Sequence, residues 1–146
     1  MEVGGDLRLA PDVVSGMLES MGAAQECFAA TGGCHGAGAY TGEGAELVVR
    51  EDIGRHNALD RVSGWLLEHD RLGDTAVLTV SGRVSYEIVA KVYRSQIQIL
   101  AAVSAPSSMA VETAEAFGIT LIGFCREDRL TVYSHRERIV CGEGAE

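Results

Sequence analysis

The spacing of hydrophobic positions alternates along the chain between a helical period and short apolar runs, and this pattern predicts the secondary structure. Apolar residues at helical spacing predict helices over 12–29, 57–71, 84–96 and 107–117. Short β-type runs predict strands over 35–40, 45–52, 76–80, 99–103, 120–125 and 130–134. The chain therefore begins helix-strand-strand-helix and then continues with strands and helices in alternation.

This order of elements predicts the α/β class, as a three-layer α/β/α sandwich around a mixed, mostly parallel sheet. The nearly all-apolar run 76–80 fits a strand covered on both faces. The Thr41-Gly42-Glu43-Gly44 connection predicts a hairpin, so one strand of the sheet runs antiparallel. No linker divides the chain, and we expect one domain over 1–146, with an N-terminal extension at 1–11 and a flexible tail at 140–146.

Charge and composition exclude several classes of function. The formal net charge is −9 at pH 7, which repels phosphate backbones and argues against nucleic acid as a partner. No apolar run is long enough to span a bilayer and no secretory signal opens the chain, so we expect a cytoplasmic protein without membrane contact. None of the four cysteines forms a CxxC pair, so we expect no disulfide framework, and we interpret Cys27 and Cys125 as small core residues.

Three polar turns connect predicted strands to predicted helices. They are Glu51-Asp52-Ile53-Gly54-Arg55-His56-Asn57, Ser81-Gly82-Arg83 and Ser104-Ala105-Pro106-Ser107-Ser108. Ligands of open α/β sheets bind beyond the carboxyl ends of the strands, so we expect these turns to share one site. The first N–H groups of the helices, together with the guanidinium groups of Arg55 and Arg83, would receive phosphate oxygens. The alternative for each residue is ordinary helix capping, which needs no ligand.

A fourth turn, Thr31-Gly32-Gly33-Cys34-His35, is a further candidate because adjacent glycines let a ligand approach the backbone. Its alternative interpretation is a helix C-cap. Glu51 and Asp52 either accept hydrogen bonds from a guanine edge or a sugar, or hold the arginines in place. A nucleotide-acting enzyme with His56 as acid or base near Asp52 is a second hypothesis, although a lone His35 or His56 is more often a satisfied polar residue than a catalyst.

Six sequence blocks together resemble one protein family. They are TGGCH at 31–35, EDIGRHNALD at 51–60, SGRVSYEIVAK at 81–91, AVSAPSSMAVETA at 102–114, GITLIGFCR at 118–126 and VYSHRERI at 132–139. In this order and spacing they resemble the C-terminal domain of the formate dehydrogenase accessory sulfurtransferase family (FdhD/NarQ), over residues 12–139. Arg61 stands where a lysine is frequent in that family.

The resemblance implies a cytidine-deaminase-like fold and an accessory role in maturing molybdenum- or tungsten-dependent formate dehydrogenases. It implies sulfur transfer from a cysteine desulfurase to the molybdenum cofactor, bound as bis-molybdopterin guanine dinucleotide by a homodimer, with GDP as an analogue. The expected partners are therefore formate dehydrogenase and a cysteine desulfurase. The expected cofactor-binding residues are Thr31, Gly32, Gly33, His35, Glu51, Asp52, Gly54, Arg55, His56, Asn57, Ser81, Gly82, Arg83, Ser104, Ala105 and Pro106.

Two departures limit what the resemblance implies. The cysteine-containing loop that the family uses for sulfur transfer precedes the domain seen here, so we expect no catalytic residue in this chain and sulfur transfer only if that loop is supplied elsewhere. Zinc deaminases need H-x-E and P-C-x-x-C motifs, whereas this chain has His56-Asn57-Ala58 and Ser81-Gly82-Arg83-Val84-Ser85, so we expect neither zinc nor deamination. A dimerising interaction module is the third hypothesis.

Overall fold

A six-stranded sheet with the strand order β2-β1-β3-β4-β5-β6 forms the middle layer of the computed structural model, which describes residues 7–24, 33–126 and 129–140. The β3–β4 and β4–β5 pairs are parallel, and the other three neighbouring pairs are antiparallel. The predicted mixed sheet is confirmed, and four of its strands share one direction, although only two of the five neighbouring pairs are parallel. The strands are β1 (His35–Tyr40), β2 (Glu46–Asp52), β3 (Val77–Val80), β4 (Ile99–Ala102), β5 (Thr120–Arg126) and β6 (Arg129–Val132).

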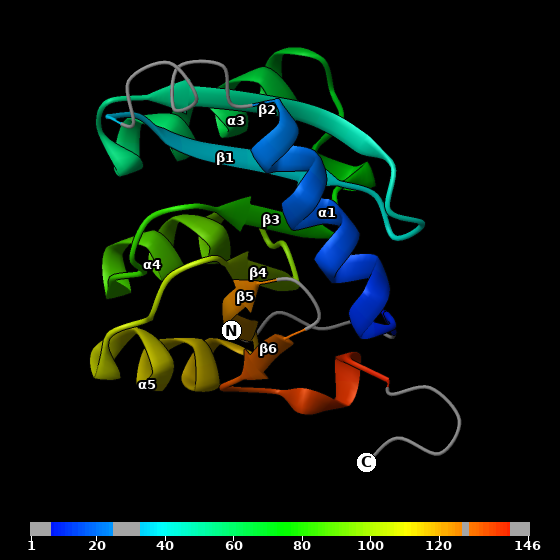
Figure 1. Cartoon of the computed structure of the whole chain (residues 1–146), viewed down its shortest axis with the longest axis vertical. Helices are drawn as coiled ribbons and strands as arrows, with labels where there is room; N and C mark the ends of the chain where they lie inside the picture. Colours follow the sequence, from blue (N-terminus) through cyan, green and yellow to red (C-terminus); the bar gives the residue numbers. More distant parts are fainter. Residues whose placement is uncertain (1–6, 25–32, 127–128, 141–146) are drawn as a thin grey trace.

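Helices cover both faces of this sheet, which confirms the predicted α/β/α sandwich. One helix, α1 (Pro11–Ala23), crosses one face, and α3 (Arg55–Glu68), α4 (Tyr86–Arg94) and α5 (Ser108–Phe117) pack on the other (Figure 1). Successive strand residues face opposite layers. Val77 and Ile99 join the core beneath α1, and Leu78 and Leu100 join the core beneath the other three helices. Two short 3-10 helices, Leu72–Asp74 and Arg136–Arg138, complete the described elements.

Local capping explains where the helices begin and end. The hydroxyls of Ser85 and Ser107 accept hydrogen bonds from the N–H groups of Ile88 and Ala110, so α4 starts two residues after the predicted 84. Gly118 takes a left-handed conformation, with φ of 81°, and ends α5. The predicted first helix is found as Pro11–Ala23, and the rest of its predicted range, together with the tail from 141, lies outside the described residues.

The two described cysteines have different environments. Cys125 is 5% exposed in the core beneath α1, as predicted, and this burial raises its pKa to about 11. Cys34 is disulfide-bonded, so the expectation of no disulfide was wrong at this residue. Absence of a CxxC pair did not exclude a bond between cysteines more distant in sequence. Cys27 lies outside the described residues. No helix in the described ranges is both long and apolar enough to cross a membrane.

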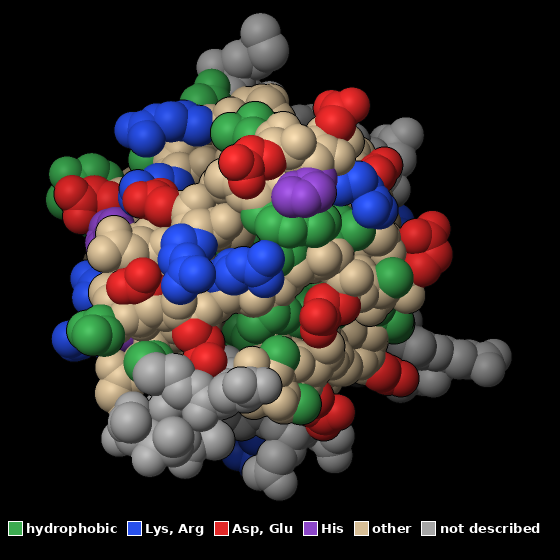
Figure 2. Space-filling model, turned by 90° about the horizontal axis from the view of Figure 1, so that it is seen from above, with side chains coloured by type: hydrophobic (Ala, Val, Ile, Leu, Met, Phe, Trp, Pro, Cys, Tyr) green, Lys and Arg blue, Asp and Glu red, His purple; other side chains and the backbone are tan. Residues whose placement is uncertain are grey.

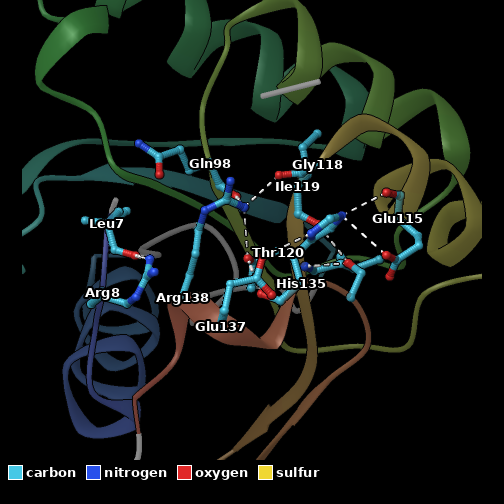
Figure 3. Close-up of polar contacts among 12 residues, drawn as sticks. Leu7, Arg8, Gln98, Glu115, Gly118, Ile119, Thr120, His135, Glu137 and Arg138 are labelled. Atoms are coloured by element: carbon cyan, nitrogen blue, oxygen red, sulfur yellow. Dashed lines mark hydrogen bonds and ion pairs between the residues drawn. The ribbon is translucent and has the colours of Figure 1, made fainter. Parts of the chain in front are cut away.

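The closing segment is held to the fold by a buried arginine (Figure 3). Arg138 is 4% exposed, and its Nη1 donates to the carbonyl of Gly118 at 2.6 Å and to Oγ1 of Thr120 at 3.1 Å. The same segment pairs with the chain just before α1, because the N–H of Leu9 donates to the Arg138 carbonyl and that of Val140 to the Leu9 carbonyl, both at 2.8 Å. The block that resembles the family's closing segment therefore ties α1 to the sheet.

His135, in the same segment, has a hydrogen-bond partner for each of its two ring nitrogens. Nε2 of His135 lies 2.8 Å from the Glu115 carbonyl and Nδ1 lies 3.2 Å from a Glu137 carboxylate oxygen (Figure 3). Both nitrogens can donate only in the protonated ring. Burial lowers the pKa of His135, but the hydrogen bonds to Glu115 and Glu137 and the charges of their carboxylates raise it above its ordinary value overall.

Replacing Arg138 by methionine is expected to lower the free energy of unfolding by about 2–4 kcal/mol, because buried acceptors such as the Gly118 carbonyl lose their charged donor. Urea unfolding measures this change. Arg136→Met is the matched control, because Arg136 is an exposed arginine of the same turn, and its effect should stay within about 0.5 kcal/mol. Equal losses in the two variants would contradict the role of Arg138.

Stability should also depend on the protonation of His135. Because the pKa is raised on folding, protonated His135 stabilises the fold fully below its unfolded pKa of about 6.5, and this contribution is lost as pH rises through the folded pKa. We expect the difference in Tm between the parent and His135→Asn to shrink from about pH 6 to about pH 8. Asparagine suits the left-handed backbone here, with φ of 47°. A pH-independent difference in thermal melts would refute the assignment.

Candidate functional site

The polar turns of the sequence gather at one edge of the sheet, on the left in Figure 1, where β2, β3 and β4 end. The strand β1 runs antiparallel between β2 and β3, so its first residue, His35, pairs with Asp52, and Ala37 pairs with Val80. The turn at 33–35, the start of α3 and the turn after β3 are therefore neighbours. Of the fourth candidate turn, Thr31 and Gly32 lie outside the described residues.

Ser81 links three of these segments by hydrogen bonds. Its Oγ accepts from the N–H of Gly36 at 2.9 Å, and its own N–H donates to the Gly36 carbonyl at 3.0 Å. The hydroxyl of Ser104 donates to the Ser81 carbonyl at 2.9 Å. The two predicted site serines thus position the turns relative to one another, a role that sequence reasoning did not assign to them.

The turns after β3 and β4 are also joined through their backbones. The N–H of Val84 donates to the Ala105 carbonyl at 3.3 Å, and the N–H of Ser107 donates to the Val84 carbonyl at 2.9 Å. These bonds form a parallel bridge between Val84 and Pro106. Ala105 and Pro106 are therefore at the predicted edge, where they brace the Ser81-Gly82-Arg83 turn.

Gly82 lies where the turn after β3 comes closest to His35 and Arg55. A Cβ added to Gly82 would lie 3.1 Å from Nδ1 of His35 and 3.2 Å from both Cβ and Cδ of Arg55. These distances are shorter than ordinary van der Waals contact, so only glycine fits without movement of a neighbour. Residues from three separate turns thus meet at Gly82, with Arg83 next in the chain.

Arg55 is the best candidate for an anion ligand among the described residues. Its side chain is half-buried, and Nε is enclosed without a hydrogen-bond partner in the described part of the chain. Buried N–H donors are almost always satisfied, so this nitrogen is suited to receive a hydrogen-bond acceptor from a ligand. Arg83 is exposed, and no ion pair joins it to another residue in the described ranges.

The start of α3 is also open, unlike the starts of α4 and α5. Gly54 is its N-cap and supplies no side-chain hydrogen bond, whereas Ser85 and Ser107 close the other two helices. Asp52 accepts instead from the N–H of Gly54 at 3.2 Å. The positive end of the α3 dipole and its first N–H groups therefore lie beside the Arg55 side chain, an arrangement that suits an oxyanion.

The acidic residues of this turn hold a different arginine from the two predicted. Arg61 donates to the Glu51 carbonyl at 2.6 Å, and its guanidinium lies 3.9 Å from an Asp52 carboxylate oxygen. Nε2 of His56 lies 3.9 Å from a carboxylate oxygen of Glu87 in α4. The His56–Asp52 pair that the enzyme hypothesis needs is thus not among the described contacts. Asn57 is exposed at the same turn.

A second cationic surface lies on the outer side of β2 and α3. Figure 2 looks onto this side and shows Lys and Arg side chains gathered in the middle of the view, next to hydrophobic ones. A shallow hollow of about 510 Å³ occurs here, lined by Arg50, Arg61, Gly64, Trp65, Leu67 and Glu68. None of these residues belongs to the predicted site, so variants in the hollow can serve as controls for variants in the site. In the described ranges no three His, Cys, Asp or Glu side chains gather as metal ligands would.

One residue at the edge was missed by sequence reasoning. Phe124 of β5 is 45% exposed and has φ of 54°, and its N–H donates to the Ser104 carbonyl at 3.3 Å. It lies within the GITLIGFCR block, but neither hydrophobic spacing nor motif chemistry distinguishes it from a buried strand residue.

Comparison with known proteins gives a consistent result. A family model described as the FdhD/NarQ family matches residues 1–140. The sulfur carrier protein FdhD of Mycobacterium tuberculosis is 50% identical over 138 residues, covering 93% of this chain and 50% of that protein. The protein of the same name from Thermoplasma acidophilum is 45% identical over 139 residues, covering 95% of this chain and 49% of that protein. The chain spans about half the length of the curated relatives it matches.

A crystal structure has the same fold. It is described as a formate dehydrogenase accessory protein from Desulfotalea psychrophila, and it superposes with a TM-score of 0.85 at 29% identity, covering 93% of this chain and 61% of that one. The α/β architecture of the present chain therefore agrees with that of an experimental relative, while the cytidine-deaminase-like comparison stays a prediction.

Gly82→Ala is expected to lower the free energy of unfolding by about 1–2 kcal/mol, because Cβ of Arg55 is anchored to the backbone and has little freedom to yield. Gly64→Ala is the matched control: a Cβ there meets nothing within 4 Å and replaces a glycine inside α3, so it should stabilise by about 0.5–1 kcal/mol. Urea unfolding of both variants checks the signs. A stabilising Gly82→Ala would show that the edge is loosely packed.

Proposed function

Because this chain belongs to the FdhD/NarQ family, we propose that it binds the guanine dinucleotide form of the molybdenum cofactor as cargo during the maturation of formate dehydrogenase. The observation that carries the proposal is the enclosed, unpartnered Nε of Arg55 beside the open start of α3. A phosphate bound there would complete the hydrogen bonding of the guanidinium group and of the free backbone amides.

The geometry of the edge supports a dinucleotide in particular. Arg83 adds a second guanidinium group one residue after Gly82, which is in close contact with Arg55. Two phosphates need more than one cationic partner, and the close approach of Arg55 to Gly82 brings the two arginines to the same edge. His35, Glu51 and Asp52 would line the remainder of the same edge.

Sulfur transfer is the second part of the proposed role. The relatives are named sulfur carrier proteins, and we infer that this chain works with a cysteine desulfurase and with formate dehydrogenase, as a homodimer. Cys34 is disulfide-bonded and Cys125 is buried, so we assign the sulfur-carrying thiols to neither of them. The described residues would then hold the cofactor while another cysteine delivers the sulfur.

The two alternative functions have less support. An enzyme acting on a small nucleotide requires an acid or base at the site, but His56 lies near Glu87 and Asp52 is engaged by Gly54 and Arg61. A module that only dimerises makes no use of the enclosed Nε of Arg55 beside the start of α3. The cofactor-binding role accounts for both observations.

Calorimetric titration with GDP tests the proposal. We expect the parent chain to bind GDP at concentrations up to about millimolar, and Arg83→Ala to weaken binding about tenfold or more, because a charged hydrogen-bond donor to phosphate is removed. Arg83 is exposed and has no ion pair in the described ranges, so its loss should leave the Tm unchanged. Arg55→Lys should also weaken binding, since lysine keeps the charge but not the planar fork.

The control is Arg50→Ala, because Arg50 lines the hollow on the outer side of β2 and α3 and belongs to no predicted turn. Its affinity for GDP should equal that of the parent. No binding by the parent chain, or a loss of affinity in Arg50→Ala but not in Arg83→Ala, would overturn the proposed site.

A further inference from the structure

Strand β2 forms one free edge of the sheet, with β1 as its neighbour on the inner side. The N–H and the carbonyl of Gly36 in β1 are both bonded to the turn after β3. Backbone groups of successive strand residues point in opposite directions, so those of Ala37 face β2 and pair with Arg50. By the same alternation, the backbone groups of Val49 and Glu51 face outward, away from β1.

Arginine side chains occupy both of these outward carbonyls. Nη1 of Arg50 donates to the Val49 carbonyl at 2.8 Å, and Nη1 of Arg61 donates to the Glu51 carbonyl at 2.6 Å. Arg61 belongs to α3 and is 10 residues from Glu51 in the sequence, so its contact depends on the fold. Its guanidinium also lies 3.9 Å from an Asp52 carboxylate oxygen, which keeps it beside the strand. Each guanidinium group thus takes the place that an N–H of a further strand would take.

The surface beside this edge would otherwise favour self-association. The hollow on the outer side of β2 and α3 is lined in part by Trp65 and by Leu67, which is 67% exposed (Figure 2). A second copy paired edge to edge would lie against this hollow, and burial of apolar surface favours association. The opposite edge strand, β6, has four residues, and a short edge strand itself opposes pairing. The edge at β2 has seven residues and therefore needs another form of protection.

We propose that Arg50 and Arg61 guard the free edge of the sheet, and that β2 pairs with β2 of a second copy of this chain when both side chains are removed. A guanidinium group bound to an outward carbonyl blocks the approach of an added strand, whose N–H groups would need the same acceptor. The inference does not rest on the proposed function, because neither arginine belongs to the cofactor site.

Repulsion between charges is a competing explanation for protection of this edge. Removal of both arginines makes the net charge of −9 more negative by two units. A chain with a larger charge of one sign repels its own copies more strongly. Association of the double variant would therefore follow from the loss of the bound side chains and not from the change in net charge.

Sedimentation velocity on the full chain tests the inference. Arg50→Met/Arg61→Met should have a weight-average mass about twofold or more above that of the parent at the same concentration, because each pairing joins two copies. Arg94→Met/Arg136→Met is the matched control, since it removes two exposed arginines from other elements and gives the same net charge. The mass of the control should equal that of the parent. Equal sedimentation of all three proteins would refute the guarding role.

Amide hydrogen exchange locates the contact. In the parent, we expect the outward N–H of Val49 to exchange rapidly. In Arg50→Met/Arg61→Met, its protection should rise about tenfold or more, because the added strand supplies an acceptor. Strong protection of this amide in the parent would mean that the edge is already paired, and association without added protection would place the contact elsewhere. Either result overturns the inference.

A proline at position 49 separates edge pairing from aggregation of unfolded chains. Val49→Pro removes an N–H that faces away from β1, so the hydrogen bonds between β1 and β2 remain. Added to Arg50→Met/Arg61→Met, it should return the mass to that of the parent. Proline in a strand also lowers stability, so association caused by unfolding would instead increase in the triple variant. That increase would contradict the inference.

Discussion

The close approach of backbone segments at Gly36, Ser81 and Gly82 is the constraint on which the candidate site depends. The paired hydrogen bonds between Gly36 and Ser81 bring the start of β1 against the end of β3. Hydrogen in place of a side chain at Gly82 then leaves space for Arg55 and His35. Without this contact the turns would still follow the same strands, but they would not share a surface. The contacts of Gly36, Ser81 and Gly82 therefore join the sheet and position the turns of the candidate site.

Helix capping distinguishes turns that look alike in the sequence. The Ser85 and Ser107 hydroxyls satisfy the first amides of α4 and α5, so these two turns are complete without a ligand. Gly54 leaves the amides of α3 unsatisfied by any side chain. Helix capping was the alternative to ligand binding for every turn. It accounts for the turns before α4 and α5, but not for the turn before α3. The proposed anion site is therefore centred on the start of α3 and is not shared equally among the three helices.

Much of the fold could be predicted because it depends on local periodicity: the apolar runs at β3 and β4 and the spacing of Leu59, Val62 and Leu66 in α3 each predict one element. The insertion of β1 between β2 and β3 could not be predicted, because no periodicity encodes the order of strands. The bond between Gly36 and Ser81 follows from that order. The positive φ of Phe124 was also inaccessible, since it accompanies a shift in the β5–β6 register that the residue type does not encode.

Cys125 lines a small cavity of about 110 Å³ together with Ser15, Leu18 and Glu19 of α1 and with Val103. With a pKa of about 11, only about one molecule in ten thousand carries the thiolate at pH 7. Alkylating reagents act on the thiolate, so the native protein should react slowly at Cys125 even where small molecules enter. The rate of its modification would then measure how often α1 separates from the sheet by local unfolding.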